Sequence, residues 1–360
     1  MENVRVQLAE RSYDIQIGAG TLAEAGRFLS ERGKVTHVVL ITDEHVQKPY
    51  AMRVAESLGE QDIEVDVISI EPGEESKSLD VAASLWQGLL ELGADRKSVV
   101  VAVGGGVVGD LAGFIAATYA RGLRFLQVPT SLLAQVDSSV GGKVGINLPD
   151  AKNMIGAFLQ PLGVLIDTAT LTTLPANEYR AGLAEVVKYG VILDAEFFEY
   201  LENNVAAVNQ RQEDVLAHVI ARCCRLKADV VEKDEREEMG LRAVLNFGHT
   251  FGHAFETLSG YGKLLHGEAV GIGMVCAARL AARLGRVDQQ FAGRLVGLLQ
   301  ALAIPVEVPR LGPQKLLDAM MHDKKVQHGR LSFVLPSRLG QVELVGDIAP
   351  ADVRAAMKTQ

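Results

Sequence analysis

The pattern of hydrophobic and polar positions changes once along the chain, near residues 168–176. Before this point, short apolar runs of strand length, such as 37–42 and 98–103, alternate with helical stretches. After it, strand patterns largely disappear and long runs with helical periodicity follow, at 195–208, 215–231 and 269–284. The pattern predicts an α/β domain over residues 1–172 and an all-helical domain over residues 173–360.

Asp43 stands where the first buried strand pattern ends. Two alternating segments, 4–9 and 13–17, precede that strand and predict a small hairpin. Because ligands of open parallel sheets bind beyond the carboxyl ends of the strands, Asp43 is placed to accept hydrogen bonds from ribose hydroxyls. Capping of the next helix by the Asp43 carboxylate is an equally good interpretation.

Three glycines follow the strand pattern at 98–103 and precede an apolar helix. Gly104, Gly106 and Gly109 satisfy G-x-G-x-x-G, in which backbone amides can approach a pyrophosphate at the amino end of a helix. The usual acidic residue about twenty positions onward is missing. A carboxylate for the ribose of a dinucleotide would therefore have to come from earlier in the chain, and Asp43 is the candidate.

Three cations, Arg121, Lys143 and Lys152, occupy glycine-punctuated segments of the first half. Asp137 lies in a stretch of small residues at 131–147, which we interpret as a loop shaped around an anion. Together they predict a phosphate or carboxylate pocket, although each lysine alone would more often be a solvated surface group.

Residues able to hold a metal concentrate in the second half. His249 and His253 are four residues apart, so on a helix both imidazoles project from one face. Glu185, His266 and one of these two histidines can supply the ligands of an open catalytic zinc site, and the spacing does not decide which. Ordinary packed or solvated histidines are the competing interpretation. Lys188, one helical turn from Glu185, needs an anion if it is buried, which favours a charged substrate.

Two further groups of polar residues lie in the second half. Arg242 and Asn246 precede His249 and could orient a carboxylate or a hydroxyl. Lys324 and Lys325 stand in a short polar break, where solvation is as good an explanation as ligand binding. Since the metal candidates fall in one half and the dinucleotide features in the other, we expect an active site in the cleft between the domains.

The composition narrows the class of protein. The chain has 360 residues, 48% of them hydrophobic, and a net charge of −9, which argues against nucleic-acid binding. Three cysteines, an odd number, suggest no disulfide framework. The first residues are charged at short intervals and no segment reaches the roughly twenty apolar residues of a membrane span. We therefore expect a soluble, cytoplasmic protein.

Taken together, the motifs resemble those of the 3-dehydroquinate synthase family. The resemblance is carried, in the family's order, by Gly104–Asp110, by QVPTSLLAQVDSSVGGK at 127–143, GLAEVVKYG at 182–190, NFGHTFGHAFE at 246–256, HGEAVGIGM at 266–274 and the DKK at 323–325. Ser131 and Val144 stand where threonines are commoner in the family, which could alter a cofactor contact but leaves the reactive groups in place.

The resemblance implies a Rossmann-like NAD-binding domain followed by a helical domain that binds one divalent metal, zinc or cobalt, and the substrate. The implied metal ligands are Glu185, His249 and His266, with His253 left to contact substrate and share proton transfers. The implied cofactor contacts are Asp43, Pro72, Gly73, Glu74, Glu75, Ser76, Lys77, Gly106, Val107, Val108, Gly109, Asp110, Thr130, Ser131, Lys143, Lys152, Thr170, Leu171, Thr172 and Thr173.

The implied substrate contacts are Arg121, Asp137, Lys143, Lys152, Asn153, Lys188, Arg242, Asn246, His253 and one of Lys324 and Lys325. The implied catalytic groups among them are Lys188, His253, Asn246, Arg242, Lys143, Lys152 and Asp137.

The implied reaction is the second step of the shikimate pathway, catalysed by a lyase that is commonly a homodimer. It converts 3-deoxy-D-arabino-heptulosonate 7-phosphate to 3-dehydroquinate and phosphate by transient oxidation with NAD, phosphate elimination, re-reduction and intramolecular aldol closure. The alternatives are a metal-dependent polyol dehydrogenase and another sugar-phosphate cyclase. Neither nucleic acid nor membrane is an expected partner.

Overall fold

The computed structural model describes residues 1–149, 151–260, 264–321 and 331–358. The chain forms two compact units. Unit 1 comprises Met1–Leu174 and Leu216–Arg236, and unit 2 comprises Pro175–Val215 and Glu237–Gln360.

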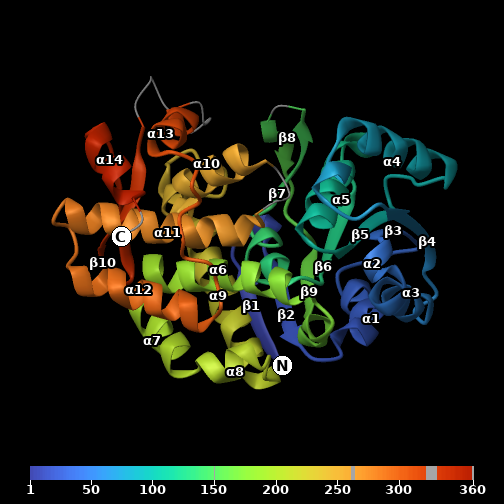
Figure 1. Ribbon diagram of the computed structural model, residues 1–360. Helices are drawn as coiled ribbons and strands as arrows, with labels where there is room; N and C mark the ends of the chain where they lie inside the picture. Colours follow the sequence, from blue (N-terminus) through green and yellow to red (C-terminus); the bar gives the residue numbers. More distant parts are fainter. Residues whose placement is uncertain (150, 261–263, 322–330, 359–360) are drawn as a thin grey trace. The chain divides into compact units, whose positions relative to one another are not determined.

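A seven-stranded sheet forms the centre of unit 1, in the order β1-β2-β9-β6-β5-β3-β4 (Figure 1). β1 and β2 form the antiparallel hairpin that the sequence predicts, and all other neighbours are parallel. The strands are β1 Glu2–Val6, β2 Tyr13–Gly18, β3 His37–Asp43, β4 Glu64–Ile70, β5 Val99–Gly104, β6 Arg124–Pro129 and β9 Gly163–Asp167.

Helices cover both faces of this sheet. Val38 and Leu40 of β3 pack into the apolar cluster of α1 and α3, whereas Val39 and Ile41 pack into the cluster of α4 and α5. Burial on both faces explains why these strands read as continuous apolar runs. The helices and short helical turns are α1 Ala25–Ser30, α2 Glu44–Val46, α3 Met52–Gly59, α4 Leu79–Glu91, α5 Gly106–Thr118, η1 Ala9–Arg11, η2 Thr21–Glu24, η3 Gln47–Ala51, η4 Glu74–Ser76, η5 Tyr119–Arg121, η6 Ala134–Ser138 and η7 Thr168–Thr172.

The stretch 131–147 is not a simple loop, contrary to the sequence-based expectation. It contains η6 and the first strand of a separate hairpin, β7 Lys143–Leu148 with β8 Ala151–Phe158. Val144 packs against α5, where a Cβ on Gly113 would lie 2.3 Å from the Val144 side chain. The small residues of this stretch thus permit close packing of the hairpin on α5.

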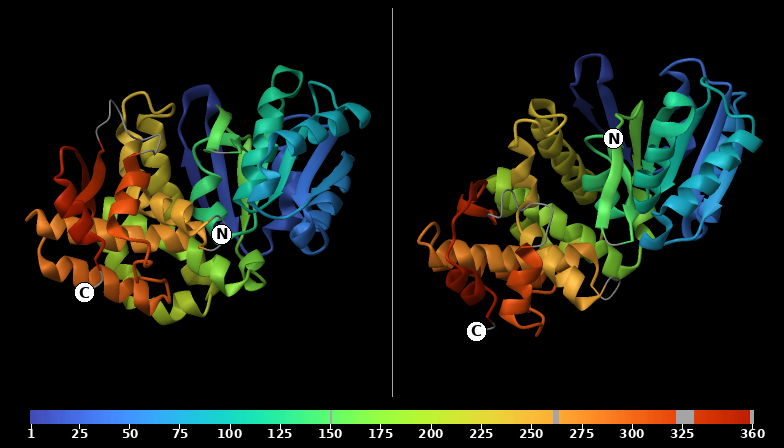
Figure 2. Two further views of the ribbon diagram at one scale, coloured as in Figure 1. Left: turned by 45° about the horizontal axis from the view of Figure 1, so that its top comes forward. Right: turned by 90° about the horizontal axis from the view of Figure 1, so that it is seen from above.

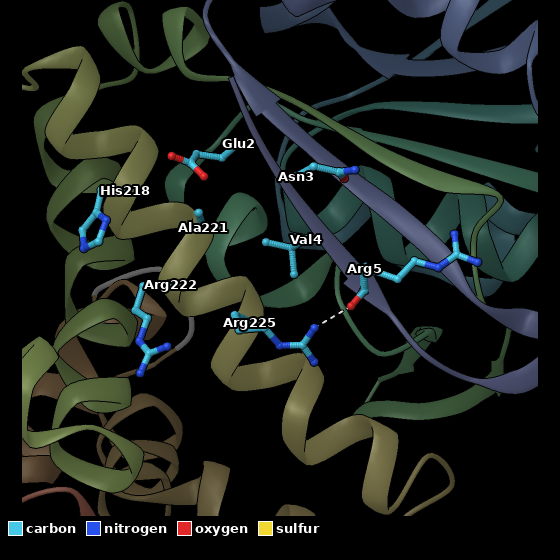
Figure 3. A pocket seen from close by; sticks show the side chains of 8 residues that line it. All are labelled: Glu2, Asn3, Val4, Arg5, His218, Ala221, Arg222 and Arg225. Carbon is cyan, nitrogen blue, oxygen red and sulfur yellow. Dashed lines mark hydrogen bonds between the residues drawn. The ribbon is translucent and has the colours of Figure 1, made fainter.

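Most of α9, Glu213–Lys233, belongs to unit 1, although its place in the chain predicts membership of the helical domain. Its Arg225 guanidinium donates to the Arg5 carbonyl at 2.5 Å, and its Glu232 carboxylate accepts from the Gln7 amide at 2.9 Å. These side chains satisfy outward-facing backbone groups at the β1 edge of the sheet. A shallow pocket of about 300 Å³ is lined by residues of β1 and α9, and none of the predicted site residues lines it. Figure 3 shows its lining side chains.

Unit 2 is built around α11, which packs against α6, α10, α12 and α14. Its helices are α6 Ala176–Leu193, α7 Ala195–Asn203, α8 Val205–Asn209, α10 His249–Ser259, α11 His266–Arg283, α12 Gln289–Ala301, α13 Pro313–Met321 and α14 Pro350–Ala356, with the short turn η8 Leu241–Asn246. The helical runs predicted at 195–208 and 269–284 are therefore confirmed.

The prediction of an all-helical second domain needs one correction. β10 Phe333–Arg338 and β11 Gln341–Val345 form an antiparallel hairpin, drawn in red in Figure 2. Gly340, with φ of +79°, lies in its turn, and Phe333 to Leu335 are buried. A single short apolar run beside a glycine was too weak a signal to predict a strand from sequence.

None of the helices in the described ranges combines the length and the hydropathy that crossing a membrane requires.

Candidate functional site

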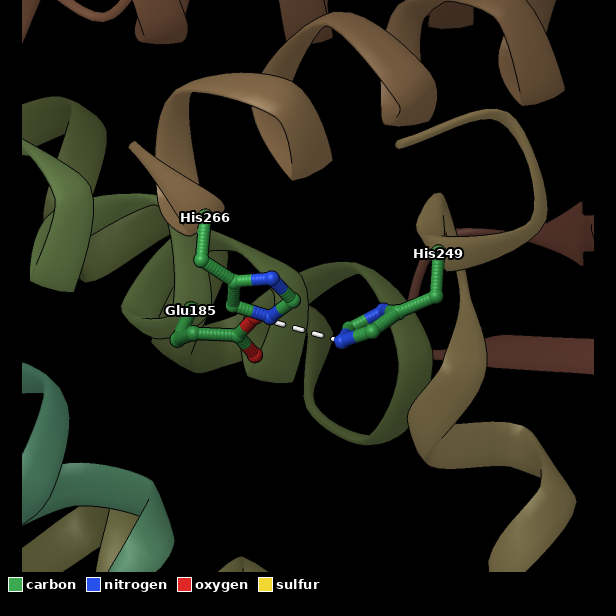
Figure 4. Close-up of side chains that lie close together, drawn as sticks. All are labelled: Glu185, His249 and His266. Atoms are coloured by element: carbon green, nitrogen blue, oxygen red, sulfur yellow. Dashed lines mark ion pairs between the residues drawn. The ribbon is translucent and has the colours of Figure 1, made fainter. Parts of the chain in front are cut away.

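Glu185, His249 and His266 come together in unit 2 from three different helices. Figure 4 shows their side chains pointing toward one another from α6, α10 and α11. The Nε2 atoms of His249 and His266 lie 3.5 and 3.8 Å from Oε1 of Glu185. One potential ligand atom from each residue lies within 4.8 Å of the other two.

Glycines allow the three helices to approach this closely. A Cβ on Gly267 would lie 1.9 Å from the Ala181 carbonyl oxygen of α6, and one on Gly273 would lie 2.1 Å from the Gly248 carbonyl oxygen. Gly248 also has φ of +81°, which favours glycine where the chain enters α10. The glycines of G-H-T-F-G-H and H-G-E-A-V-G-I-G therefore set the separation of the helices that carry the three side chains.

The second ring nitrogen of each histidine has its own partner. Nδ1 of His249 lies 3.1 Å from the Phe247 carbonyl oxygen, which can only accept, so the neutral ring carries its proton on Nδ1. Nδ1 of His266 lies 3.3 Å from Oε2 of Glu256. With the proton on Nδ1, each neutral ring directs an Nε2 lone pair toward the Glu185 carboxylate. Hydrogen bonds from Nδ1 to a carbonyl or carboxylate oxygen are the contacts that orient metal-bound histidines in proteins.

A cation fits between these groups. Glu185 is fully buried. Its Oε2 is ion-paired with the Lys188 ammonium, whereas its Oε1, which faces both Nε2 atoms, has no hydrogen-bond partner among the residues that the structure describes. A buried carboxylate that faces two lone pairs is unfavourable without positive charge between them. Two ligands of one tetrahedral zinc ion lie about 3.4 Å apart, close to the 3.5 and 3.8 Å that separate the two Nε2 atoms from Oε1 of Glu185. The donor set therefore suits a divalent metal.

A second set of three donors shares His266. It consists of His253, Glu256 and His266, whose potential ligand atoms also lie within 4.8 Å of one another. The His253 ring centroid lies 5.7 Å from that of His249 and 6.1 Å from that of His266. Both histidines of the predicted helix thus lie at the cluster, and the structure offers two arrangements for the same ion.

Lys188 has its anion within unit 2. It is buried on α6, and its ammonium forms an ion pair with Oε2 of Glu185. Burial of Lys188 therefore does not by itself require an anionic substrate, which corrects that part of the sequence argument. Arg242 is also buried, with Nε 3.6 Å from Oε1 of Glu237, whereas Asn246 is half-buried. Lys324 and Lys325 lie outside the described residues.

In unit 1, the predicted cofactor residues gather at one edge of the sheet. Strand register places Asp43 opposite Ile70, where β4 ends, and Gly104 opposite Pro129, where β6 ends. Asp43 itself follows Thr42, which is opposite Val103 of β5. The predicted segments 72–77, 104–110, 130–131 and 170–173 therefore all follow the carboxyl ends of parallel strands. β3 and β5 are neighbours whose outgoing connections diverge, which is the usual place for a dinucleotide.

Asp43 serves as a helix cap in this structure. Its Oδ1 accepts hydrogen bonds from the amides of His45 at 2.9 Å and Val46 at 3.2 Å. Of the two interpretations that the sequence left open, capping is therefore observed. Binding of ribose hydroxyls by the same carboxylate stays a prediction.

Lys77 connects three predicted site segments through hydrogen bonds of its side chain. Its buried ammonium donates to Asp110 at 2.7 Å and to Asn153 at 2.6 Å. Burial lowers the pKa of Lys77, but attraction to Asp110 and Glu74 outweighs this effect and raises the pKa above its ordinary value. The loop after β4, the first turn of α5 and the hairpin β7–β8 thus share one charged contact.

Two of the three predicted cations lie toward opposite ends of the β7–β8 hairpin. Arg121 and Lys143 are exposed, and Lys152 is half-buried. Lys143 pairs with Phe158 at one end of the β7–β8 hairpin, whereas Lys152 follows Ala151 at the other. The strand rise separates the two lysines by about 14 Å along the hairpin. The structure therefore does not place these two predicted cations side by side.

Comparison with known proteins identifies the family. Models described as 3-dehydroquinate synthase N-terminal and C-terminal match residues 67–181 and 182–326. A 3-dehydroquinate synthase from Desulforamulus reducens is 52% identical over 358 residues, and the match covers 99% of each sequence. The chain belongs to the 3-dehydroquinate synthase family. The resemblance inferred from the motifs is confirmed.

Two solved structures of related cyclases share the fold. A 2-deoxy-scyllo-inosose synthase complexed with carbaglucose-6-phosphate, NAD+ and Co2+ has a TM-score of 0.90 and 27% identity, with 99% of each chain covered. A 2-epi-5-epi-valiolone synthase from Streptomyces hygroscopicus subsp. jinggangensis 5008, with NAD+ and Zn2+ bound, has a TM-score of 0.88 and 29% identity, with 97% of each chain covered. These similarities confirm the predicted fold class.

One buried charge of this member of the 3-dehydroquinate synthase family, that of Lys227, was not predicted from the sequence. Lys227 of α9 donates to Oδ1 of Asp137 at 2.5 Å and to the Asp137 carbonyl at 2.8 Å. One turn earlier, the Cys224 thiol donates to the Gln135 carbonyl, and burial raises the pKa of this thiol to about 12. A single lysine in an amphipathic helix gives no sequence signal of such a partner.

Replacement of Gly267 by alanine is expected to disturb the cluster. The added Cβ would overlap the Ala181 carbonyl, so α11 must shift, which costs about 1–3 kcal/mol and displaces His266. Divalent-metal affinity, measured by chelator competition, should fall together with thermal stability. Gly297→Ala, at an exposed α12 position with no atom near the new Cβ, is the control and should be stabilising by up to about 1 kcal/mol. Unchanged metal affinity in Gly267→Ala would argue against the glycine contact as the cause of convergence.

Glu256→Gln distinguishes the two donor sets. If Glu256 only orients His266, the variant should bind zinc about 10- to 100-fold more weakly, whereas Glu185→Gln should lose far more affinity. Zinc titration against a chromophoric chelator gives both values. The reverse order, with Glu256→Gln the more damaging change, would assign the ion to His253, Glu256 and His266.

Proposed function

We propose that this chain converts 3-deoxy-D-arabino-heptulosonate 7-phosphate to 3-dehydroquinate and phosphate, as a lyase that uses NAD and one divalent metal. The observation that carries the proposal is the buried Glu185 carboxylate facing two imidazole nitrogens, in a chain with 52% identity to a named 3-dehydroquinate synthase. The NAD+ and Co2+ or Zn2+ present in the two related cyclase structures support the choice of cofactors.

Glu185, His249 and His266 would hold the metal. The fit rests on Oε1 of Glu185, which faces both imidazoles and has no hydrogen-bond partner within the described chain, and on the Nδ1 contacts of both rings. When bound, the metal supplies Lewis-acid polarisation of a hydroxyl, and NAD supplies a hydride acceptor that is regenerated in each turnover. Glu256 and the Phe247 carbonyl would keep the two imidazoles in the tautomer that leaves Nε2 available.

His253 is the residue best placed to move a proton. It is half-buried, and its ring centroid lies 5.7 Å from that of His249 and 6.1 Å from that of His266, so a hydroxyl held at the ligands would lie beside it. Lys188 would limit the negative charge on Glu185 and, with Arg242 and Asn246, orient the polar groups of the substrate. Arg121, Lys143, Lys152 and Asn153 are proposed to bind its anionic or hydroxyl groups, and Asp137 is held for such contacts by Lys227.

NAD would bind along the carboxyl edge of the sheet in unit 1. The first-turn amides of α5 suit a pyrophosphate, because the positive end of the helix dipole favours anionic groups. Gly109 leaves room for this helix to lie close to β6, since a Cβ there would approach Gln127 to 3.0 Å. Asp43 would bind the ribose, and segments 72–77, 130–131 and 170–173 would line the site.

Cytoplasmic location and a homodimeric state are further parts of the proposal. Cys223, Cys224 and Cys276 are buried and form no disulfide, as suits a reducing compartment. The homodimer is proposed from the family resemblance alone.

The reaction can be tested with the heptulosonate phosphate, NAD and zinc. Phosphate should be released with carbocycle formation while absorbance at the NADH band shows no net increase, because the hydride is returned to the substrate. A polyol dehydrogenase acting on glycerol-like substrates would instead accumulate NADH in stoichiometric amount. Turnover of sedoheptulose or glucose phosphate in place of the heptulosonate phosphate would favour another cyclase activity.

The two roles of Asp43 can be separated by two substitutions. Asn caps helices as well as Asp, so Asp43→Asn should keep stability within about 0.5 kcal/mol, while Asp43→Ala should lose about 1 kcal/mol. Loss of a charged acceptor for ribose should weaken NAD binding about tenfold or more in both variants. Calorimetric titration with NAD and thermal unfolding measure the two effects. If Asp43→Asn binds NAD as tightly as the wild type does, the Asp43 carboxylate does not bind the ribose.

A further inference from the structure

The segment after β9, residues 168–173, is held by two buried side chains outside the predicted cofactor set. We name this segment the threonine turn, because four of its six residues are threonines. It contains η7 and ends at Thr173. Thr170 is buried, whereas Thr172 and Thr173 are exposed. The turn follows a carboxyl end of the sheet, where the proposed function places NAD, so its position affects that site directly.

Gln135 bridges two strands that have separated. The β6–β9 ladder contains only the pairs Leu126 with Gly163 and Gln127 with Val164, so the last residues of both strands are not paired with each other. The fully buried amide Nε2 of Gln135 fills this gap by donating to Pro129 O and Asp167 O, both at 3.2 Å. The same nitrogen lies 3.1 Å from the hydroxyl oxygen of Thr170.

Tyr50 holds the threonine turn from the other side. It is a buried residue of η3, the turn that follows Asp43 and α2. Its hydroxyl donates to the Thr170 carbonyl at 3.2 Å and is hydrogen-bonded to the Thr173 hydroxyl. Tyr50 therefore connects the segment after β3 with the segment after β9, just as Gln135 connects the ends of β6 and β9.

The geometry of Gln135 argues against simple packing. Its Oε1 is buried without a hydrogen-bond partner in the described part of the chain, and burial of an unpaired amide oxygen reduces stability. Its Nε2 donors pair with the carbonyls of Pro129 and Asp167 and with the Thr170 hydroxyl, so the amide fixes these three groups relative to one another.

We propose that Tyr50 and Gln135 are positioning residues that fix the threonine turn against the ends of β3 and β6 and thereby set the affinity for NAD. This inference rests on the proposed function, because it assumes that NAD binds at this edge. Neither residue would touch the reacting atoms. Both would act by presenting Thr170 to Thr173 in one arrangement before the cofactor binds.

Tyr50→Phe and Gln135→Met test the proposal, since each removes hydrogen bonds while nearly preserving volume. With zinc-loaded full-length protein, the dissociation constant for NAD and the KM for NAD should rise about tenfold in each variant. At saturating NAD, kcat should stay within about twofold of wild type. Zinc affinity should not change, because the metal donors lie in unit 2.

Tyr179→Phe is the matched control. It also removes one buried hydroxyl that donates to a backbone carbonyl, that of Val208 at 2.6 Å, but it lies in unit 2. It should lower the unfolding temperature without changing NAD affinity. Hydrogen exchange at residues 168–173 provides an independent readout, and these amides should exchange faster in Tyr50→Phe and Gln135→Met than in wild type or Tyr179→Phe.

The outcomes separate the two proposals. Absence of NAD binding by the wild type overturns the proposed function itself. Normal NAD binding by the wild type, with unchanged NAD affinity in both variants despite lower unfolding temperatures, limits Tyr50 and Gln135 to structural roles and overturns this inference. If Gln135→Met does not fold, Tyr50→Phe, which loses only one hydroxyl, decides the question alone.

Discussion

The buried negative charge of Glu185 is the constraint on which unit 2 depends. A carboxylate inside a helical core is tolerated only when positive charge lies beside it. Lys188 supplies part of that charge from the same helix, and two imidazole nitrogens face the remaining side of the carboxylate. The backbone contacts at Gly267 and Gly273 follow from this requirement, because only close packing of α6, α10 and α11 lets three separate side chains reach one ion.

A different constraint organises unit 1. Parallel strands must end at the same edge of the sheet, so residues far apart in the chain are collected there without any direct sequence relation. Asp43 and Gly104 end β3 and β5, and Thr130 follows the neighbouring strand β6. Hydrogen bonds then adjust the loops at this edge: Lys77 joins its own loop to α5 and to the β7–β8 hairpin, while Gln135 spans the place where β6 and β9 separate.

The limits of sequence reasoning are visible in particular residues. Periodicity predicted the parallel strands and long helices because each buries apolar faces continuously. It missed β7–β8, where glycines replace the apolar alternation, and β10–β11, where a short run resembles part of a helix. Chain order assigned α9 to the helical domain. Its amphipathic pattern shows that one face of the helix is buried but not which unit buries it. Lys227 gave no signal because Asp137 is distant in sequence, and the motif that contains Glu256 did not show its contact with His266, which depends on how α10 and α11 pack.

By itself, the sequence determined the family and the change from a sheet unit to a mainly helical one. It also determined which chemical groups are available: a carboxylate, three imidazoles, a glycine-rich strand-to-helix turn and scattered cations. These follow from residue type, spacing and local periodicity. Only the tertiary structure decided that His249 and His266 both turn Nε2 toward Glu185, that Glu256 lies behind His266, and that Asp43 caps a helix. Such facts depend on how helices and strands from different parts of the chain pack, and packing is a property of surfaces that no local pattern encodes.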